Sequence, residues 1–265
     1  MQKVKPKKFL GQHFLTDMSV AQRIASTLDD YVGMPVLEVG PGMGVLSQFL
    51  LEKGHDLTVV ELDRESVAYL ERNFPNLEGR IIGEDFLQLD VDSLFEGDYC
   101  VIGNYPYNIS SQIFFKVLES KDRVKCCSGM LQKEVAERMA AQPGGKDYGA
   151  LSVAIQYYTE PEIAFIVPPT SFIPAPAVDS AVIVCKRRVK PPVEVCDEAL
   201  FFRVVKAAFS LRRKMLSNSL KNMGIKAEQV AKWLELAGVD GKRRAETLSL
   251  EDFAKLTNSF NEATK

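Results

Sequence analysis

The tetrapeptide Asn104-Tyr105-Pro106-Tyr107 combines side chains that could hold a planar substrate carrying an amine. The carboxamide of Asn104 can both donate and accept hydrogen bonds, and the ring of Tyr107 offers a flat face on which a nucleobase could stack. Adenine, with its exocyclic amine, has the matching chemistry. The same residues would also suit a strand end followed by a proline turn and a buried tyrosine. So short a motif does not separate the two interpretations.

The element that must position this tetrapeptide is the apolar run at residues 99–102, which predicts a short buried strand. Pro106 cannot continue the strand, and it forces Tyr105 into an extended or turn conformation. The amide of Asn104 is therefore expected at the carboxyl end of a strand. Ligands of open α/β sheets bind at that edge.

A strand, a glycine-rich turn, a helix and a second strand are predicted earlier in the chain. The second strand ends in Glu61, 21 residues after the first glycine of the turn. Glycines let the backbone turn tightly and approach a ligand closely, and an acid at this spacing pairs with ribose hydroxyls in nucleotide-binding folds. The strands are residues 36–39 and 57–60, the helix is 45–53, and the glycines are Gly40, Gly42 and Gly44.

The spacing of the glycines discriminates between two cofactors. A dinucleotide fingerprint reads GxGxxG and places a pyrophosphate at the helix N-terminus. Here the spacing is GxGxG, and Glu38 stands two residues before the first glycine. An acid at that position suits a cationic amino-acid group better than a pyrophosphate, so the pattern favours S-adenosylmethionine (SAM).

An acidic pair, Glu84 and Asp85, follows the third predicted strand at residues 80–82. A carboxylate there could accept a hydrogen bond from the exocyclic amine of the cofactor's adenine, and Phe86 could flank the ring. We favour Asp85 over Glu84 because Asp-Phe at this place resembles the pattern of SAM-dependent enzymes. An acid that simply begins a helix would look the same.

The whole pattern predicts an α/β fold with two domains. Residues 1–188 are expected to form a Rossmann-like SAM-binding methyltransferase domain with a basic N-terminal arm and a mostly parallel seven-stranded sheet. Pro191-Pro192 marks a linker, and residues 189–265 are expected to form a small all-helical domain. The other predicted strands are 125–131, 162–167 and 182–186, the last two forming an antiparallel edge. The other predicted helices are 17–30, 64–73, 110–119, 133–141, 148–158, 197–210, 214–223, 227–237 and 250–260.

The composition of the 265-residue chain excludes several classes of protein. No apolar run approaches the length of a membrane span, and no apolar core follows the basic first residues as a signal peptide requires. We therefore expect a cytoplasmic protein. With only His13 and His55 and no CxxC pair among the five cysteines, we expect no bound metal.

Charge is distributed unevenly along the chain. Residues 181–265 hold 17 Lys and Arg against 10 Asp and Glu, whereas residues 1–180 hold 16 against 25. The C-terminal part is thus the better candidate to meet a polyanion, although charge runs often only solvate helix faces. Clustered cations at helix joints suit phosphate contacts, and here they are Arg212, Arg213, Lys214, Lys242, Arg243 and Arg244.

Motifs along nearly the whole chain resemble one family, the ribosomal RNA adenine dimethyltransferases of the bacterial KsgA/RsmA type. They occur in the family's order and in both expected domains. The matching residues are 9–15 (FLGQHFL), 38–44 (EVGPGMG), Glu61, 85–86 (DF), 104–110 (NYPYNIS), 148–153 (YGALSV), 172–183 (FIPAPAVDSAVI), 208–220 (AFSLRRKMLSNSL) and 244–249 (RAETLS).

The resemblance implies an activity, a cofactor and a partner. Two adjacent adenosines near the 3′ end of small-subunit (16S) rRNA would each receive two methyl groups on the exocyclic amine, with SAM as donor. The partner would be rRNA in an immature small subunit during ribosome biogenesis. The protein would act as a monomer. Cofactor contacts would come from Gln12, His13, Leu15, Glu38, Gly40, Gly42, Gly44, Glu61, Leu62, Asp85, Phe86 and Asn104. The catalytic group would be Asn104, Tyr105, Pro106 and Tyr107, with Phe172 on the second face of the base or else in the core.

One residue departs from the family pattern, because Tyr105 stands where leucine is usual. Its carbonyl can still accept a hydrogen bond, so the chemistry should survive while the shape of the base pocket changes. Two other functions are alternatives. One is a large-subunit rRNA adenine methyltransferase of the antibiotic-resistance type, and the other is a non-catalytic RNA- or DNA-binding assembly or transcription factor on the same fold.

Overall fold

The computed structural model describes residue 7 and residues 10–264. The chain forms two compact units, and neither is continuous in sequence. Residues 1–136 and 160–187 make the first unit, and residues 137–159 and 188–265 make the second. The expected division after residue 188 lies next to one of these transitions. Residues 137–159 differ from the expectation, because they belong to the helical unit.

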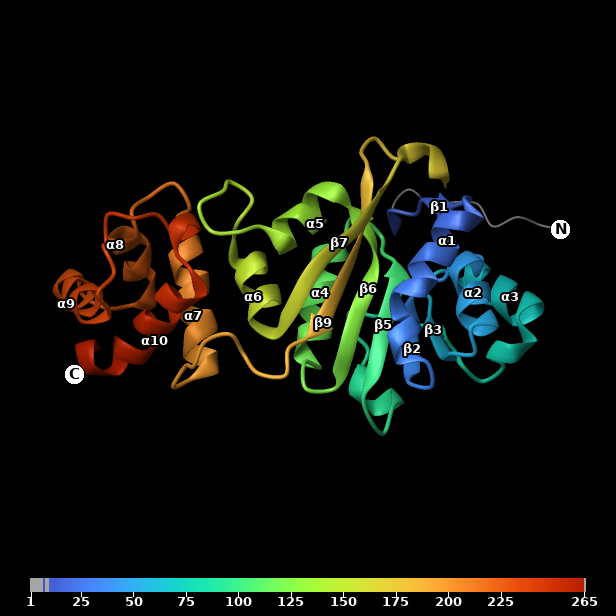
Figure 1. Cartoon of the computed structure of the whole chain (residues 1–265), viewed down its shortest axis with the longest axis horizontal. Coiled ribbons are helices and arrows are strands. Elements are labelled where there is room, and N and C mark those ends of the chain that lie inside the picture. The colour runs from blue at the N-terminus through green and yellow to red at the C-terminus, as the bar shows by residue number, and fades with distance from the viewer. Residues whose placement is uncertain (1–6, 8–9, 265) are drawn as a thin grey trace. The chain divides into compact units, whose positions relative to one another are not determined.

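The first unit is built on a seven-stranded sheet with the strand order β4-β3-β2-β5-β6-β9-β7 (Figure 1). Strands β2 to β6 pair in parallel, and β9 runs antiparallel to β6. This is the mostly parallel sheet predicted, with an antiparallel strand near one edge. The strands are β2 (Pro35–Val39), β3 (Asp56–Val60), β4 (Ile81–Ile82), β5 (Tyr99–Asn104), β6 (Val124–Gln132), β7 (Thr159–Val167) and β9 (Ser180–Arg187). A separate two-stranded sheet pairs β1 (Phe14–Leu15) with β8 (Phe172–Ile173).

Helices of the first unit pack against this sheet. Asp17 caps the first of them, because its carboxylate accepts hydrogen bonds from the amides of Ser19 and Val20. The predicted helix at residues 17–30 is in fact an α-helix followed by a 3-10 helix. The helices are α1 (Met18–Ala25), the 3-10 helix Ser26–Tyr31, α2 (Val45–Glu52), α3 (Arg64–Asn73), α4 (Ser110–Glu119) and α5 (Lys133–Ala140), which runs across the division between the units.

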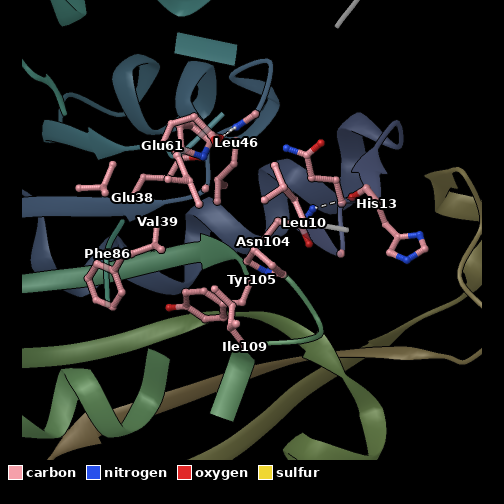
Figure 2. Close-up of a pocket in the computed structure, with 18 of the residues that line it drawn as sticks. Leu10, His13, Glu38, Val39, Leu46, Glu61, Phe86, Asn104, Tyr105 and Ile109 are labelled. Carbon is pink, nitrogen blue, oxygen red and sulfur yellow. Dashed lines mark hydrogen bonds between the residues drawn. The ribbon is translucent and has the colours of Figure 1, made fainter. Parts of the chain in front are cut away.

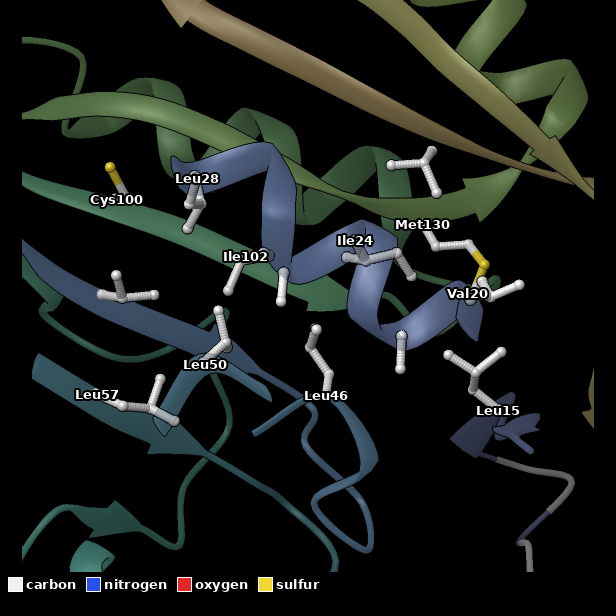
Figure 3. Packing of buried hydrophobic residues seen from close by; sticks show 14 of the residues in the cluster. Leu15, Val20, Ile24, Leu28, Leu46, Leu50, Leu57, Cys100, Ile102 and Met130 are labelled. Atoms are coloured by element: carbon white, nitrogen blue, oxygen red, sulfur yellow. The ribbon is translucent and has the colours of Figure 1, made fainter. Parts of the chain in front are cut away.

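The core of the first unit joins α1 and α2 to the central strands (Figure 3). Ile24 and Leu28 project from one side of α1 and its 3-10 extension, because residues four apart lie on the same helical face. They pack with Leu50 of α2 and Ile102 of β5, all fully buried. This packing fixes the carboxyl ends of β2 and β5 relative to each other.

The second unit is helical and has its own core. Trp233 is fully buried there, and its indole N–H donates to the carbonyl oxygen of Leu256 at 2.6 Å. The predicted helix at residues 214–223 is a short α-helix continued by a 3-10 helix. The helices are α6 (Ala150–Tyr158), α7 (Glu198–Phe209), α8 (Leu216–Ser219), the 3-10 helix Leu220–Met223, α9 (Ala227–Ala237) and α10 (Leu250–Thr264).

No helix in the described part of the chain is long and apolar enough to cross a membrane. The same residues contain no group of three or more His, Cys, Asp or Glu side chains that could hold a metal ion.

Candidate active site

A cavity of about 200 Å³ opens at the carboxyl ends of β2, β3 and β5 (Figure 2). Gly40 and Gly42 lie on its wall with φ of +71° and +56°, a conformation that residues with a side chain rarely adopt. The turn after β2 can therefore lie close against a ligand. Most of the predicted residues line this cavity: Gln12, His13, Leu15, Glu38, Gly40, Gly42, Glu61, Leu62, Asp85, Phe86, Asn104, Tyr105, Pro106 and Tyr107.

Gly44 and Phe172 are not among the residues that line the cavity. Gly44 begins α2 with φ of +75°, and a Cβ there would overlap the ring of Phe74. Its need for glycine comes from packing. Phe172 is 3% exposed and belongs to the core, where β8 pairs it with Leu15. The structure thus favours the core interpretation of Phe172 over a stacking wall opposite Tyr107.

Glu61 ties two loops of the cavity together. Its carboxylate accepts hydrogen bonds from the amide of Gly42 at 3.0 Å and from the amide of Asp63 at 2.8 Å. Burial raises the pKa of Glu61 above its ordinary value, while these backbone donors oppose the rise. The carboxylate is held at the end of β3, the position from which acids bind ribose hydroxyls.

Glu38 is an almost fully buried acid, 1% exposed, at the end of β2. The hydroxyl of Ser47 donates to its carboxylate at 2.6 Å, and no cation pairs with it among the residues that the structure describes. Burial raises the pKa of Glu38 to about 8, with a smaller contribution from the negative charge of Glu61. A buried carboxyl without a counter-ion fits the positively charged amino-acid end of SAM.

Both members of the acidic pair after β4, Glu84 and Asp85, border the cavity. The carboxylate of Asp85 also accepts a hydrogen bond from the amide of Leu87 at 3.0 Å, so it fixes the local turn as well. Phe86 is buried beside them. Asp85 therefore has the local structural role that the sequence left open, and it lies where it could also accept from an adenine amine.

Asn104 is the last residue of β5, and the nitrogen of its side-chain amide is already hydrogen-bonded. The Nδ2 group donates to the carbonyl oxygen of His13 at 3.1 Å. The Oδ1 atom is therefore the side of the amide left to accept a hydrogen bond from a substrate amine.

Tyr105 projects into the core beneath this site. It is 1% exposed, and its hydroxyl donates to the carbonyl oxygen of Ser128 at 2.7 Å. Two glycines make room for the ring, because a Cβ at Gly103 or Gly129 would lie 2.9 or 2.6 Å from ring carbons of Tyr105. The tyrosine that replaces the family's usual leucine is thus accommodated by the neighbouring strands β5 and β6.

Tyr107 and the N-terminal arm meet at the rim of the cavity. The Tyr107 and His13 rings stack with centroids 5.0 Å apart and an angle of 28° between planes. The Tyr107 hydroxyl shares a hydrogen bond with the hydroxyl of Ser180. The aromatic face expected to receive a base is therefore in contact with a residue of the arm.

The sequence analysis missed the residues that fasten the arm. The ammonium of Lys7 forms ion pairs with Asp63 and, at 3.2 Å, with Glu65, and the amide of Lys7 donates to the side chain of Gln12 at 2.8 Å. Asp63 also caps α3. Asp63 stands two residues after Glu61, just beyond the strand, and this position in the sequence could have indicated its role.

The six predicted RNA-binding residues lie in the second unit, on two segments that adjoin. The amides of Leu216 and Ser217 donate to the carbonyl oxygens of Arg243 and Gly241 at 2.7 and 3.0 Å. Four of the six are exposed and form no ion pair within the described part of the chain: Arg213, Lys214, Lys242 and Arg244. The other two pair with acids, Arg212 with Glu246 at 3.4 Å and Arg243 with Asp252 at 2.9 Å.

The parallel sheet, the GxGxG turn and the acids at three successive strand ends define a SAM-dependent methyltransferase. The model of the family described as ribosomal RNA adenine dimethylase matches residues 3–262. The chain belongs to this family.

Individual relatives cover the whole chain. A protein of Parabacteroides distasonis named ribosomal RNA small subunit methyltransferase A is 59% identical over 258 residues, which are 97% of this chain and 94% of that protein. The protein of the same name from Bacteroides thetaiotaomicron is 53% identical over 266 residues, 100% of this chain and 97% of its own length. Among solved structures, the 23S rRNA methyltransferase ErmE has a TM-score of 0.69 at 26% identity, covering 94% of this chain and 99% of its own. A dimethyladenosine transferase from Plasmodium falciparum shares the fold with a TM-score of 0.76 at 23% identity, covering 95% and 98%.

Proposed function

We propose that this protein transfers methyl groups from SAM to the exocyclic amines of two adjacent adenosines near the 3′ end of small-subunit rRNA. The observation on which the proposal depends is the placement of Asn104. Its free amide oxygen borders the same cavity as the buried acids Glu38 and Glu61. The names of the relatives that are 53% and 59% identical support the small subunit as substrate. The large-subunit alternative has weaker support, because the 23S rRNA methyltransferase ErmE is only 26% identical.

The cofactor would be held by groups at the strand ends. Glu38 would face the amino-acid end, Glu61 the ribose, and Asp85 with Phe86 the adenine, and the turn at Gly40 would allow a close approach; all these residues line the cavity. When bound, SAM supplies an electrophilic methyl group on a sulfonium centre. The chain itself contributes position, and part of the cavity wall consists of buried side chains such as Glu38, Val39 and Phe86.

The substrate amine would be oriented by Asn104 and by a backbone carbonyl at Tyr105. The lone pair of an adenine amine is delocalised into the ring, so the amine is a weak nucleophile. Hydrogen bonds from its N–H groups to the Asn104 Oδ1 atom and to the carbonyl favour a pyramidal nitrogen. The lone pair then points toward the methyl donor, and rate enhancement comes mainly from positioning and electrostatics. The base must leave its stack to enter, and Tyr107 offers it an aromatic face.

The test is methylation by the purified protein with tritiated SAM, using immature small subunits and large subunits in parallel. We expect label in small-subunit rRNA only. Primer extension should then stop at two adjacent adenosines near the 3′ end. Label in large-subunit rRNA would instead support the antibiotic-resistance type of enzyme. RNA that is bound but left unmodified would support a non-catalytic factor.

The exposed cations of the second unit would contact phosphates. We expect the triple variant Arg213→Ala/Lys214→Ala/Arg244→Ala to bind rRNA more weakly and with a flatter salt dependence. Each lost phosphate contact should lower the slope of log K against log salt by about 0.7–0.9. The control replaces Lys226, Lys232 and Lys255, three exposed lysines outside the two segments, with alanine. Equal slopes for the two triple variants would contradict phosphate contacts at these positions.

We further propose that the protein acts as a monomer on an immature subunit in the bacterial cytoplasm. The rRNA substrate named for its relatives supports this setting, because bacterial ribosomes assemble there. Sedimentation of the purified protein alone and with small subunits at successive stages of assembly tests both points.

A further inference from the structure

The arm at residues 10–15 contacts the segment at residues 104–108 in three places. The carbonyl oxygen of His13 accepts from Asn104, the His13 ring stacks on Tyr107, and Gly11 lies so close to Asn108 that a Cβ would come within 2.5 Å of its Oδ1 atom. Figure 2 shows the His13 ring turned away from Glu38 and Glu61. The side chain of His13 thus belongs to the substrate side of the cavity, although its backbone borders the cofactor side.

The His13 ring has the interactions of a small planar base. One face stacks on Tyr107, and Nδ1–H donates to the carbonyl oxygen of Pro174 at 2.8 Å. The Tyr107 hydroxyl is in turn held by Ser180, so the phenol ring is fixed while the imidazole that covers it is not buried. A stacked aromatic pair contributes about 0.5–1.5 kcal/mol beyond its buried area, an amount that a larger base can compete with.

We propose that the His13 side chain is a displaceable occupant of the face of Tyr107 that receives the target adenine. This inference rests on the proposed function. The incoming base replaces the imidazole on Tyr107 and leaves the Pro174 carbonyl open to a donor of the RNA. No covalent bond changes in this step.

Displacement of the ring leaves the rest of the site intact. Rotation about the Cα–Cβ bond of His13 moves the imidazole without moving its carbonyl oxygen. The hydrogen bond from the Asn104 amide to that oxygen is therefore kept, and Oδ1 still faces the amine. His13 is in this sense a residue that controls base entry through its side chain and orients Asn104 through its backbone.

The test uses the full-length variants His13→Ala and His13→Trp with saturating SAM and unmethylated small subunits. Removal of a competing ring raises the fraction of protein open to the base. We expect the KM for small subunits to fall about 3- to 10-fold in His13→Ala, matching the worth of one stacked pair. It should rise in His13→Trp, whose larger ring competes more strongly. Gln22→Ala, an exposed change on α1, is the control with the wild-type KM.

A second readout does not depend on methyl transfer. An rRNA hairpin with 2-aminopurine at a target position reports the environment of that base by fluorescence. We expect His13→Ala to bind it with the larger change in fluorescence and His13→Trp with the smaller. A higher KM and a smaller fluorescence change in His13→Ala would overturn the proposal, as would no difference from wild type, because His13 would then support the base or do nothing. Failure of the proposed function is distinct, since the wild-type protein would then fail to methylate small subunits.

Discussion

Asn104→Ala is expected to lower kcat for methyl transfer by about 100- to 1000-fold, the usual cost of losing one preorganised polar group at a reacting centre. The amide is the one side chain at the end of β5 that both borders the cavity and has an unoccupied acceptor. Without it the adenine amine loses the partner that turns its lone pair. SAM affinity should fall less, by under about 10-fold, because one hydrogen bond contributes roughly 1 kcal/mol. Single-turnover rates and calorimetric SAM binding measure the two effects separately.

Two variants sharpen this test. Asn104→Asp keeps an acceptor oxygen but places a carboxylate against the carbonyl oxygen of His13, which now accepts from the amide at 3.1 Å. It should be slow as well, and that result would show that the orientation of the group matters. Asn76→Ala, at an exposed position that does not line the cavity, removes an amide of the same kind and should retain most activity. A purified Asn104→Ala protein that methylates near the wild-type rate would rule out the assigned role.

The sheet could be predicted because its strands are short apolar runs bounded by glycine, proline or charged residues. Strands β2 and β3 are examples, since β2 is largely buried, β3 is buried at its carboxyl end, and each ends in a residue that borders the cavity. Position at a strand end is a local property. The acids Glu38, Glu61 and Asp85 were therefore predictable from one stretch of sequence each.

The properties that escaped prediction depend on distant partners. The orientation of Tyr105 is set by Gly129 and by the Ser128 carbonyl of the neighbouring strand. The burial of Phe172 depends on its pairing with Leu15, and the position of the His13 ring depends on Pro174. Neither pairing appears in any window of sequence. The placement of residues 137–159 in the second unit has the same cause, because the apolar side chains of a helix do not specify which core the helix joins.

Glu38→Gln is expected to make the ligand-free protein more stable at high pH and less able to bind SAM. Burial raises the pKa of Glu38 from 4.5 to about 8 in the folded state. Folded wild-type protein therefore holds the Glu38 proton more tightly than the unfolded chain does. The stabilisation that results is fully present below pH 4.5, and it is lost as the pH rises through about 8. Each tenfold difference in proton affinity corresponds to about 1.4 kcal/mol, so the loss amounts to several kcal/mol. Glutamine can still accept from Ser47 and carries no charge to bury.

The measurement is the free energy of unfolding of both proteins from pH 5 to 9, without cofactor, together with calorimetric SAM binding. The free energy of unfolding of Glu38→Gln relative to that of wild type should increase with pH up to about 8 and then level off. SAM binding should weaken about 10- to 100-fold in the variant, because a charged hydrogen bond is lost. Ser47→Ala is the matched control, because it removes the donor that opposes the rise in the Glu38 pKa and should move the pH dependence upward. Parallel stability profiles for wild type and Glu38→Gln would show that Glu38 is ionised in the free protein. An unchanged SAM affinity in Glu38→Gln would show that the carboxyl is not the group that selects a cationic cofactor.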